Sequence, residues 1–131
     1  YRIQKYWLIG DKTGTAEIFI ENLPGFPDNV SSNEEGIFWV ALFNPRNDFI
    51  EMSSNKPFLR KMVLRLPESL QPQPINHSYV LGLDEVGTVV YNLQYKADEA
   101  YSPITSVKQY ENNLYFGSLT HAGWGKIEIP K

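Results

Sequence analysis

The stretch Val89-Val90-Tyr91-Asn92-Leu93-Gln94-Tyr95 repeats an apolar or aromatic side chain at every second position. In an extended chain, Val89, Tyr91, Leu93 and Tyr95 share one face, because successive side chains point to opposite sides of a strand. This period predicts a β-strand with these side chains on one face.

Other segments outside this stretch also have the character of short strands. Residues 16–21, 79–83 and 114–116 alternate in the same way, and 37–43 is a continuous apolar run, which is typical of a strand buried on both sides. Four polar or glycine-containing turn signals separate these segments: 11–14, 33–36, 85–87 and 111–113. Short strands at this spacing predict an all-β sandwich, barrel or set of propeller blades.

One segment has helical periodicity instead. Ser54-Asn55-Lys56-Pro57 offers helix-start residues, and Pro67 ends the pattern. The apolar residues at helical spacing are Phe58, Leu59, Met62, Val63 and Leu66. We interpret about 54–67 as an inserted amphipathic helix packed on a sheet. A lid over a pocket, or membrane contact through 57–66, is the less favoured alternative.

Composition excludes several classes of protein. The 131 residues carry a net charge of −3, which argues against a nucleic-acid partner, and include no cysteine, which excludes disulfides and thiolate chemistry. The chain opens in mid-pattern at Tyr1 without a start Met, and we expect further polypeptide upstream.

A weak internal echo bears on the architecture. Residues 33–40 and 111–117 both join a polar turn to an aromatic strand, about 77 residues apart. We interpret this interval as two blades of roughly 40 residues, so that the chain holds about three blades. Three blades cannot close a ring, so the first strands and the last sheet should pair with chain outside these residues.

Four stretches together resemble the strictosidine synthase-like family of six-bladed β-propellers. They are 6–17, with Tyr6-Trp7-Leu8-Ile9-Gly10 and Gly14-Thr15-Ala16-Glu17; 21–30, with Leu23-Pro24-Gly25-Phe26-Pro27-Asp28-Asn29; 36–41, Gly36-Ile37-Phe38-Trp39-Val40-Ala41; and 114–119, Leu114-Tyr115-Phe116-Gly117-Ser118-Leu119. The resemblance covers almost all of residues 1–131 and matches the C-terminal half of family members. It implies that the N-terminal half of the propeller is a partner of this segment.

Related propellers, the paraoxonases and gluconolactonases, hold a calcium ion in the central channel with oxygen ligands. The resemblance places Asp28 and Asn29 where those relatives direct an Asp or Asp-Asn at the metal. It also implies that Asp28 can orient or deprotonate an attacking water. The alternative is that Asp28-Asn29 only caps a turn after Pro27.

Two departures from the family pattern bear on chemistry. The acid–base Glu of true strictosidine synthase corresponds to Thr105 or Ser106, and a hydroxyl cannot exchange a proton near neutral pH as a carboxyl group can. Strictosidine synthesis is therefore not expected. The pocket His of paraoxonases corresponds to Phe43, which argues against a paraoxonase-like His mechanism.

His121 ends a strand in which family members often carry a His, and it is a candidate base or hydrogen-bond donor. A structural role between blades is the alternative. By resemblance, Leu119, Thr120 and Phe43 would shape the wall of a ligand pocket. Asn76-His77-Ser78 and Asn29-Val30-Ser31 fit the glycosylation pattern, which matters only on a secretory route. The compartment stays open, with the secretory pathway, the extracellular space or the periplasm preferred.

We therefore expect a calcium-dependent hydrolase of the arylesterase or lactonase type, with a small ester or lactone as substrate. The alternative is a catalytically silent propeller that binds a ligand or a protein.

Overall fold

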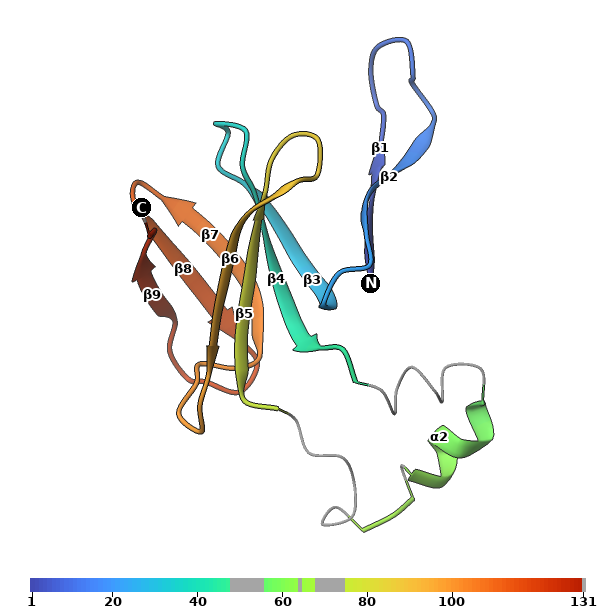
Figure 1. Ribbon diagram of the computed structural model, residues 1–131, viewed down its shortest axis with the longest axis vertical. Helices are drawn as coiled ribbons and strands as arrows, with labels where there is room; N and C mark the ends of the chain where they lie inside the picture. Colours follow the sequence, from blue (N-terminus) through green and yellow to red (C-terminus); the bar gives the residue numbers. More distant parts are fainter. Residues whose placement is uncertain (48–55, 64, 68–74, 131) are drawn as a thin grey trace.

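The computed structural model describes residues 1–47, 56–63, 65–67 and 75–130. Their strands form three antiparallel sheets that follow one another along the chain and lie side by side (Figure 1). The strands are β1 (Arg2–Tyr6), β2 (Ala16–Glu21), β3 (Gly25–Ser32), β4 (Phe38–Pro45), β5 (His77–Leu83), β6 (Val89–Lys96), β7 (Ile104–Tyr110), β8 (Asn113–Ser118) and β9 (Gly125–Glu128). The all-β expectation is confirmed, and the arrangement is that of about three blades of a β-propeller.

The three sheets contain different numbers of strands. The first pairs β1 with β2, the second has the order β3-β4-β5-β6, and the third has the order β7-β8-β9. In the second and third sheets, each strand pairs antiparallel with the next strand along the chain. In each of these two sheets the strands therefore lie in their order along the sequence, which makes each sheet a β-meander.

The central strands of the middle sheet, β4 and β5, are buried on both faces. Along β4, Trp39 and Ala41 join the core cluster shared with the third sheet, whereas Val40 and Leu42 join the cluster on which the first sheet packs. The continuous apolar run at 37–43 follows from this position, because both sides of the strand meet a neighbouring sheet. The expectation of a strand buried on both sides is confirmed.

The first strands of the second and third sheets, β3 and β7, lie next to each other. Four hydrogen bonds join residues of β3, or of the turn after it, to residues of β7 that are 76 positions later. They run from Asn29 Nδ2 to the Thr105 carbonyl (2.8 Å), from Ser31 Oγ to the Val107 carbonyl (2.6 Å), from Asn33 Nδ2 to Gln109 Oε1 (3.2 Å), and from Lys108 Nζ to the Ser32 carbonyl (3.0 Å).

This spacing corrects one interpretation of the sequence. The interval of about 77 residues separates adjacent sheets, not sheets two apart, because β3 and β7 are the first strands of consecutive sheets. The interval is long because residues 46–76 form an insertion between β4 and β5. The expected count of about three blades holds nonetheless, since β1 and β2 form a further sheet on the other side of the middle one.

The inserted helix is α2 (Pro57–Val63), shorter than the expected 54–67, of which 54, 55 and 64 lie outside the described residues. The expectation that its apolar face packs on a sheet is wrong for Phe58 and Met62. Phe58 is 71% exposed and Met62 is 53% exposed, and the helix lies apart from the sheets (Figure 1). Within the described residues, no helix has the length and apolar character needed to cross a membrane.

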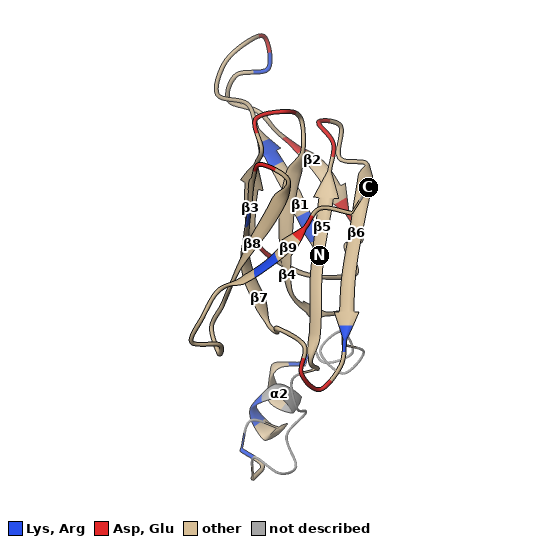
Figure 2. Ribbon diagram, turned by 90° about the vertical axis from the view of Figure 1, so that its left-hand side faces the viewer, with Lys and Arg blue, Asp and Glu red and all other residues tan. Residues whose placement is uncertain are grey.

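Charged side chains are distributed unevenly between the sheets and the insertion (Figure 2). Acidic residues occur in the turns between strands, whereas the described residues of 56–67 contain Lys56, Lys61 and Arg65 and no acidic side chain. The described residues of 56–67 therefore carry positive charge beside exposed apolar side chains.

Candidate functional site

The predicted site residues gather at one end of the sheets. Because neighbouring strands are antiparallel, the starts of β3 and β7 lie at the same end as the ends of β4 and β8, and the insertion leaves from that end (Figure 1). The residues at this end are Asp28 and Asn29 on β3, Phe43 on β4, Thr105 on β7, and Leu119, Thr120 and His121 after β8.

Asp28 and Asn29 lie in a β-bulge of β3. Pro27 pairs with Leu42 and Val30 pairs with Val40, so β3 has one residue more than β4 across this interval. A bulge re-aims side chains and is common beside active sites. Asp28 is exposed, and its carboxylate has no hydrogen bond or ion pair to any described residue. Its oxygens are therefore open to a ligand or to water.

Asn29 is held in place by the neighbouring sheet. Its Nδ2 donates to the backbone carbonyl of Thr105 at 2.8 Å. Because a carbonyl can only accept, this bond fixes which amide atom faces β7 and leaves Oδ1 as the free atom. Asn29 therefore offers an amide oxygen in the same bulge as Asp28.

Thr105 occupies a second bulge, at the matching place on β7. Ile104 pairs with Ser118 and Ser106 pairs with Gly117, which leaves Thr105 as the extra residue. The Thr105 Oγ1 donates to the Gly117 carbonyl at 3.3 Å. The hydroxyl of Thr105 is thus bound within its own sheet. The hydrogen bond from Asn29 joins the bulge of β3 to the bulge of β7.

Phe43 lies in an irregular part of β4. Gly25 pairs with Pro45 and Pro27 with Leu42, so here β4 carries the extra residue. The chains approach closely at this point, since a Cβ on Gly25 would stand 2.5 Å from the carbonyl oxygen of Asn44. Only glycine fits there. Phe43 is partly buried.

His121 belongs to a network that joins loops. Its Nε2 accepts a hydrogen bond from the backbone N–H of Ser102 at 3.3 Å, and its ring stacks on Tyr101 with centroids 4.6 Å apart. Thr120 Oγ1 donates to the Ser102 carbonyl at 3.0 Å. His121 and Thr120 together therefore fasten the loop before β7, whereas Leu119 is 75% exposed.

Ser102 was not identified from the sequence, and it is the centre of this network. It is 7% exposed, and its Oγ accepts from the backbone N–H of His77 at 3.2 Å. The same Oγ lies 3.3 Å from the His77 carbonyl and 3.5 Å from the Ile75 carbonyl. Ser102 thus joins the end of the insertion to the loops before β7 and after β8. A serine in a polar loop carries no pattern that would reveal this role.

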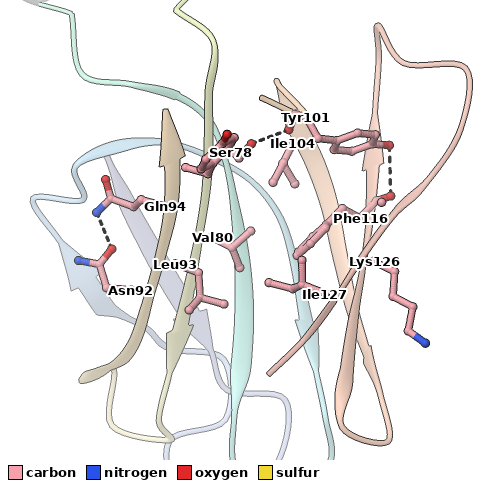
Figure 3. A pocket seen from close by; sticks show the side chains of 12 residues that line it. Ser78, Val80, Asn92, Leu93, Gln94, Tyr101, Ile104, Phe116, Lys126 and Ile127 are labelled. Atoms are coloured by element: carbon pink, nitrogen blue, oxygen red, sulfur yellow. Dashed lines mark hydrogen bonds between the residues drawn. The ribbon is translucent and has the colours of Figure 1, made fainter. Parts of the chain in front are cut away.

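A separate concave surface lies between the second and third sheets (Figure 3). It is a groove of ≈ 560 Å³ lined mainly by apolar side chains from β5 to β9, and none of the predicted site residues lines it. The groove is therefore distinct from the polar end of the first strands.

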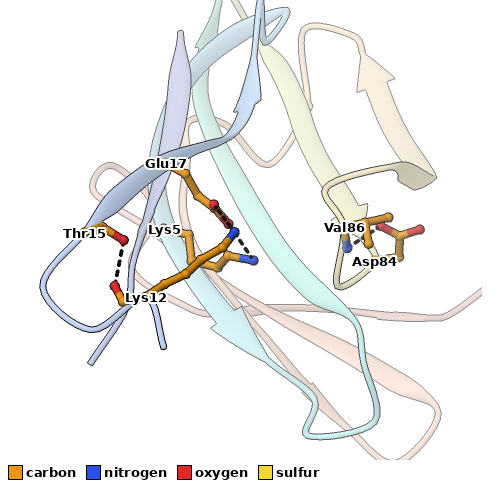
Figure 4. Close-up of polar contacts among 6 residues, drawn as sticks. All are labelled: Lys5, Lys12, Thr15, Glu17, Asp84 and Val86. Carbon is orange, nitrogen blue, oxygen red and sulfur yellow. Dashed lines mark hydrogen bonds and ion pairs between the residues drawn. The ribbon is translucent and has the colours of Figure 1, made fainter. Parts of the chain in front are cut away.

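Two further polar networks lie away from this end (Figure 4). One is in the β1–β2 hairpin, and the other is in the turn between β5 and β6. The hydrogen bond from Lys12 (2.9 Å) lowers the pKa of Glu17 below its ordinary value, and Lys5 also contributes. The backbone N–H of Thr88 (2.7 Å), followed by that of Val86, lowers the pKa of Asp84. Each contact closes a turn within a single hairpin, so neither network forms a site.

The donor set around Asp28 suits a hard cation only in part. Among the described residues, no group of three or more His, Cys, Asp or Glu side chains is close enough together to hold a metal ion. Calcium takes six to eight oxygen ligands, including amide and backbone carbonyl oxygens. Asp28 and Asn29 could supply two of them, and the others would come from outside this pair.

These features define a class of protein: a partial β-propeller whose first strands carry bulged, polar residues at one open end. No family model matches the chain. The chain is, however, 34% identical to strictosidine synthase-like 3 of Arabidopsis thaliana over 98% of its own length, and 36% identical to strictosidine synthase-like 10 of that plant over 90%. It is 31% identical to the adipocyte plasma membrane-associated protein of Bos taurus over 90%.

The chain therefore belongs to the strictosidine synthase-like family. It spans about a third of the length of these curated relatives: 34%, 33% and 30%. The roles of Asp28, Asn29, Phe43, Leu119, Thr120 and His121 stay predictions.

Proposed function

We propose that this segment contributes to a strictosidine synthase-like propeller that hydrolyses a small ester or lactone with the help of calcium, and that does not synthesise strictosidine. The observation that carries the proposal is the bulge of β3, in which Asp28 is exposed with no hydrogen bond or ion pair to a described residue, and in which Asn29 is held by its Nδ2 and leaves Oδ1 available. Carboxylate and amide oxygens are the hard ligands that suit a divalent cation such as calcium.

Each residue has a stated part in this proposal. Calcium, when bound, would act as a Lewis acid toward the carbonyl oxygen of an ester or lactone. Asp28 would accept a hydrogen bond from the attacking water and orient it, or take its proton. The bond from Asn29 to the Thr105 carbonyl would hold the amide oxygen in a fixed position and so lower the cost of ordering it on binding.

The remaining residues would form the walls of the pocket. Phe43 and Leu119 would offer apolar contact to the substrate, and Thr120 is held by its bond to Ser102. Further oxygen ligands and further walls would come from the part of the propeller outside these residues.

A second candidate is a propeller that binds a ligand or a protein without catalysis. Three observations favour it. Thr105 stands in place of a carboxylic acid and uses its hydroxyl within its own sheet, Phe43 stands in place of a histidine, and Nε2 of His121 already accepts a bond from the backbone. On this account Asp28 and Asn29 hold a cation or a polar ligand only.

The turnover of phenyl acetate and of a simple lactone by the full polypeptide, with calcium and with a chelator, distinguishes the two candidates. The hydrolase account predicts calcium-dependent turnover that falls by at least about 100-fold in Asp28→Asn, because an amide cannot replace a carboxylate as a base. Asp11→Asn makes the same change of charge in the β1–β2 turn and should leave turnover unchanged. Calcium binding without turnover would favour the silent binder, and the absence of both would contradict both accounts.

A further inference from the structure

The insertion exposes apolar side chains on one side of helix α2. Phe58 is 71% exposed and Met62 is 53% exposed, and because they are four positions apart they lie one turn apart on the same side of the helix. Leu66, just beyond the helix, is 41% exposed. Among the described residues, none from this segment joins a core cluster, and α2 lies apart from the sheets (Figure 1, Figure 2). Neighbouring apolar side chains that are exposed together indicate an interaction surface.

The same segment is uniformly basic. Residues 56–67 include four cationic side chains and no Asp or Glu, although the whole chain has a net charge of −3; the four are Lys56, Arg60, Lys61 and Arg65. Lys61 follows Phe58 by three positions and therefore lies on the flank of the apolar side chains. Lys56, Lys61 and Arg65 are exposed and form no ion pair with a described residue. The apolar side chains are thus bordered by cations that can attract an anionic partner.

The position of α2 favours contact with an extended surface. The insertion leaves from the end of the sheets that carries Asp28, whereas the acidic turns at 33–36 and 84–87 close the opposite end (Figure 2). The acidic loop at 97–99 belongs to the near end but follows β6, away from α2 (Figure 1). The basic segment can therefore approach a negatively charged surface without bringing the acidic turns close to it.

We propose that residues 56–67 dock on the surface of a bilayer that contains anionic lipid. Phe58 and Met62 enter the boundary between headgroups and acyl chains, and Lys61 and Arg65 lie at the level of the negatively charged headgroups. Burial of apolar area and attraction to the lipid charge both contribute to such binding. Docking turns the end that carries Asp28 toward the bilayer, because the insertion leaves from that end (Figure 1).

A bilayer suits this segment better than a protein partner does. The helix has only seven residues, whereas a stable protein interface buries about 1,200–2,000 Å² in total. A fluid lipid surface requires no complementary shape, and each cation near an anionic leaflet adds attraction. An acidic protein is the alternative occupant, and the experiment distinguishes it.

Flotation of the full polypeptide with phospholipid vesicles tests the proposal. The partition coefficient should be at least about 10-fold higher on vesicles with about 30% phosphatidylserine than on phosphatidylcholine alone, and it should fall as salt is raised. A chelator is present and substrate is absent, so a failure here is distinct from a failure of the proposed hydrolase. Equal partition on both kinds of vesicle would overturn the proposal. So would an absence of binding, which is expected if an acidic protein or another part of the polypeptide covers α2.

Matched double variants test whether the apolar side chains of α2 make the contact. Phe58→Ser with Met62→Ser should lower the partition coefficient on anionic vesicles by at least about 10-fold. Leu8→Ser with Ile9→Ser makes the same kind of change in the β1–β2 turn, where these residues are 77% and 82% exposed, and should leave binding unchanged. Equal losses in the two double variants would contradict the proposal.

A second pair of variants tests the requirement for charge. Lys61→Glu should weaken binding to anionic vesicles by at least about 5-fold and change binding to neutral vesicles little. Lys12→Glu makes the same change of charge in the β1–β2 turn and should have little effect on either. Both side chains are exposed, so both variants should fold as the wild type does. An unchanged affinity of Lys61→Glu for anionic vesicles would overturn the proposal.

Discussion

Ser102 joins three loops through its backbone and its hydroxyl group. Its backbone N–H is bound by His121, its carbonyl by Thr120, and its Oγ by the backbone at His77. All of these groups lie at the end that carries Asp28 and Asn29. The geometry of the candidate site therefore depends on a residue that offers no chemistry of its own.

Ser102→Ala should lower the free energy of unfolding by about 1–3 kcal/mol, because the partly buried N–H of His77 loses its acceptor. Urea denaturation measures the change. Thr13→Ala removes an exposed hydroxyl bond to the Gly10 carbonyl and should cost less. An equal cost in both variants would mean that the network around Ser102 contributes no special stability.

The stability of the folded protein should depend on pH through Asp84. Its pKa is lowered chiefly by the backbone N–H of Thr88, so ionised Asp84 stabilises the turn between β5 and β6. A depressed pKa in the folded state contributes stability above the ordinary value of 3.8, and this stability is lost as pH falls through the lower folded value. Thermal denaturation should therefore show a loss of stability below about pH 4 that is smaller in Asp84→Asn. An identical acid profile in that variant would contradict this assignment.

At the scale of elements, strand character was predictable and the helix only partly so. Alternation at 89–95 and the apolar run at 37–43 identified β6 and β4, because each side chain in those strands meets either a neighbouring sheet or solvent. The bulges at Asp28 and at Thr105 were not predictable, since the extra residue in each depends on the register of two strands that pair across a turn.

The helical period of the sequence predicted α2 but did not predict how this helix packs. The pattern at Phe58 and Met62 predicts a helix, yet nothing in it states which surface would cover these side chains, and both are exposed. The double variant Phe58→Ser and Met62→Ser should change the free energy of unfolding by less than about 0.5 kcal/mol.

A core residue provides the contrast for this prediction. Leu114 is fully buried in the cluster between the second and third sheets, and Leu114→Ala should cost about 2–5 kcal/mol. Chemical denaturation compares the variants. A large loss from the helix variant would mean that α2 packs on the protein in solution.

At the scale of the whole molecule, the order of the sheets depends on close contacts between neighbours. Gly87, in the turn between β5 and β6, has φ of 88°, and a Cβ there would collide with the carbonyl oxygen of Phe19 in β2. This contact joins the first sheet to the second. The contact could not be derived from local patterns, and the internal repeat gave the interval between β3 and β7 without showing that their sheets are adjacent, because both features join residues far apart in the chain.

Gly87→Ala should destabilise the protein by at least about 1 kcal/mol, because it combines an unfavourable φ with a clash against backbone. Gly123→Ala is the control, since a Cβ at that position meets no atom within 4 Å. Differential scanning calorimetry would compare the two melting temperatures. Equal melting temperatures would argue against the packing of the first sheet on the second.

The cation-binding role of the bulge in β3 is tested most directly by the melting temperature of the full polypeptide as calcium is added. A ligand at about 100 times its Kd stabilises the folded state by about 2.7 kcal/mol, so the wild type should melt several degrees higher with calcium. In Asp28→Asn this rise should largely disappear, while in Asp11→Asn it should be retained. A wild type that melts at the same temperature with and without calcium, or an equal rise in Asp28→Asn, would contradict the account.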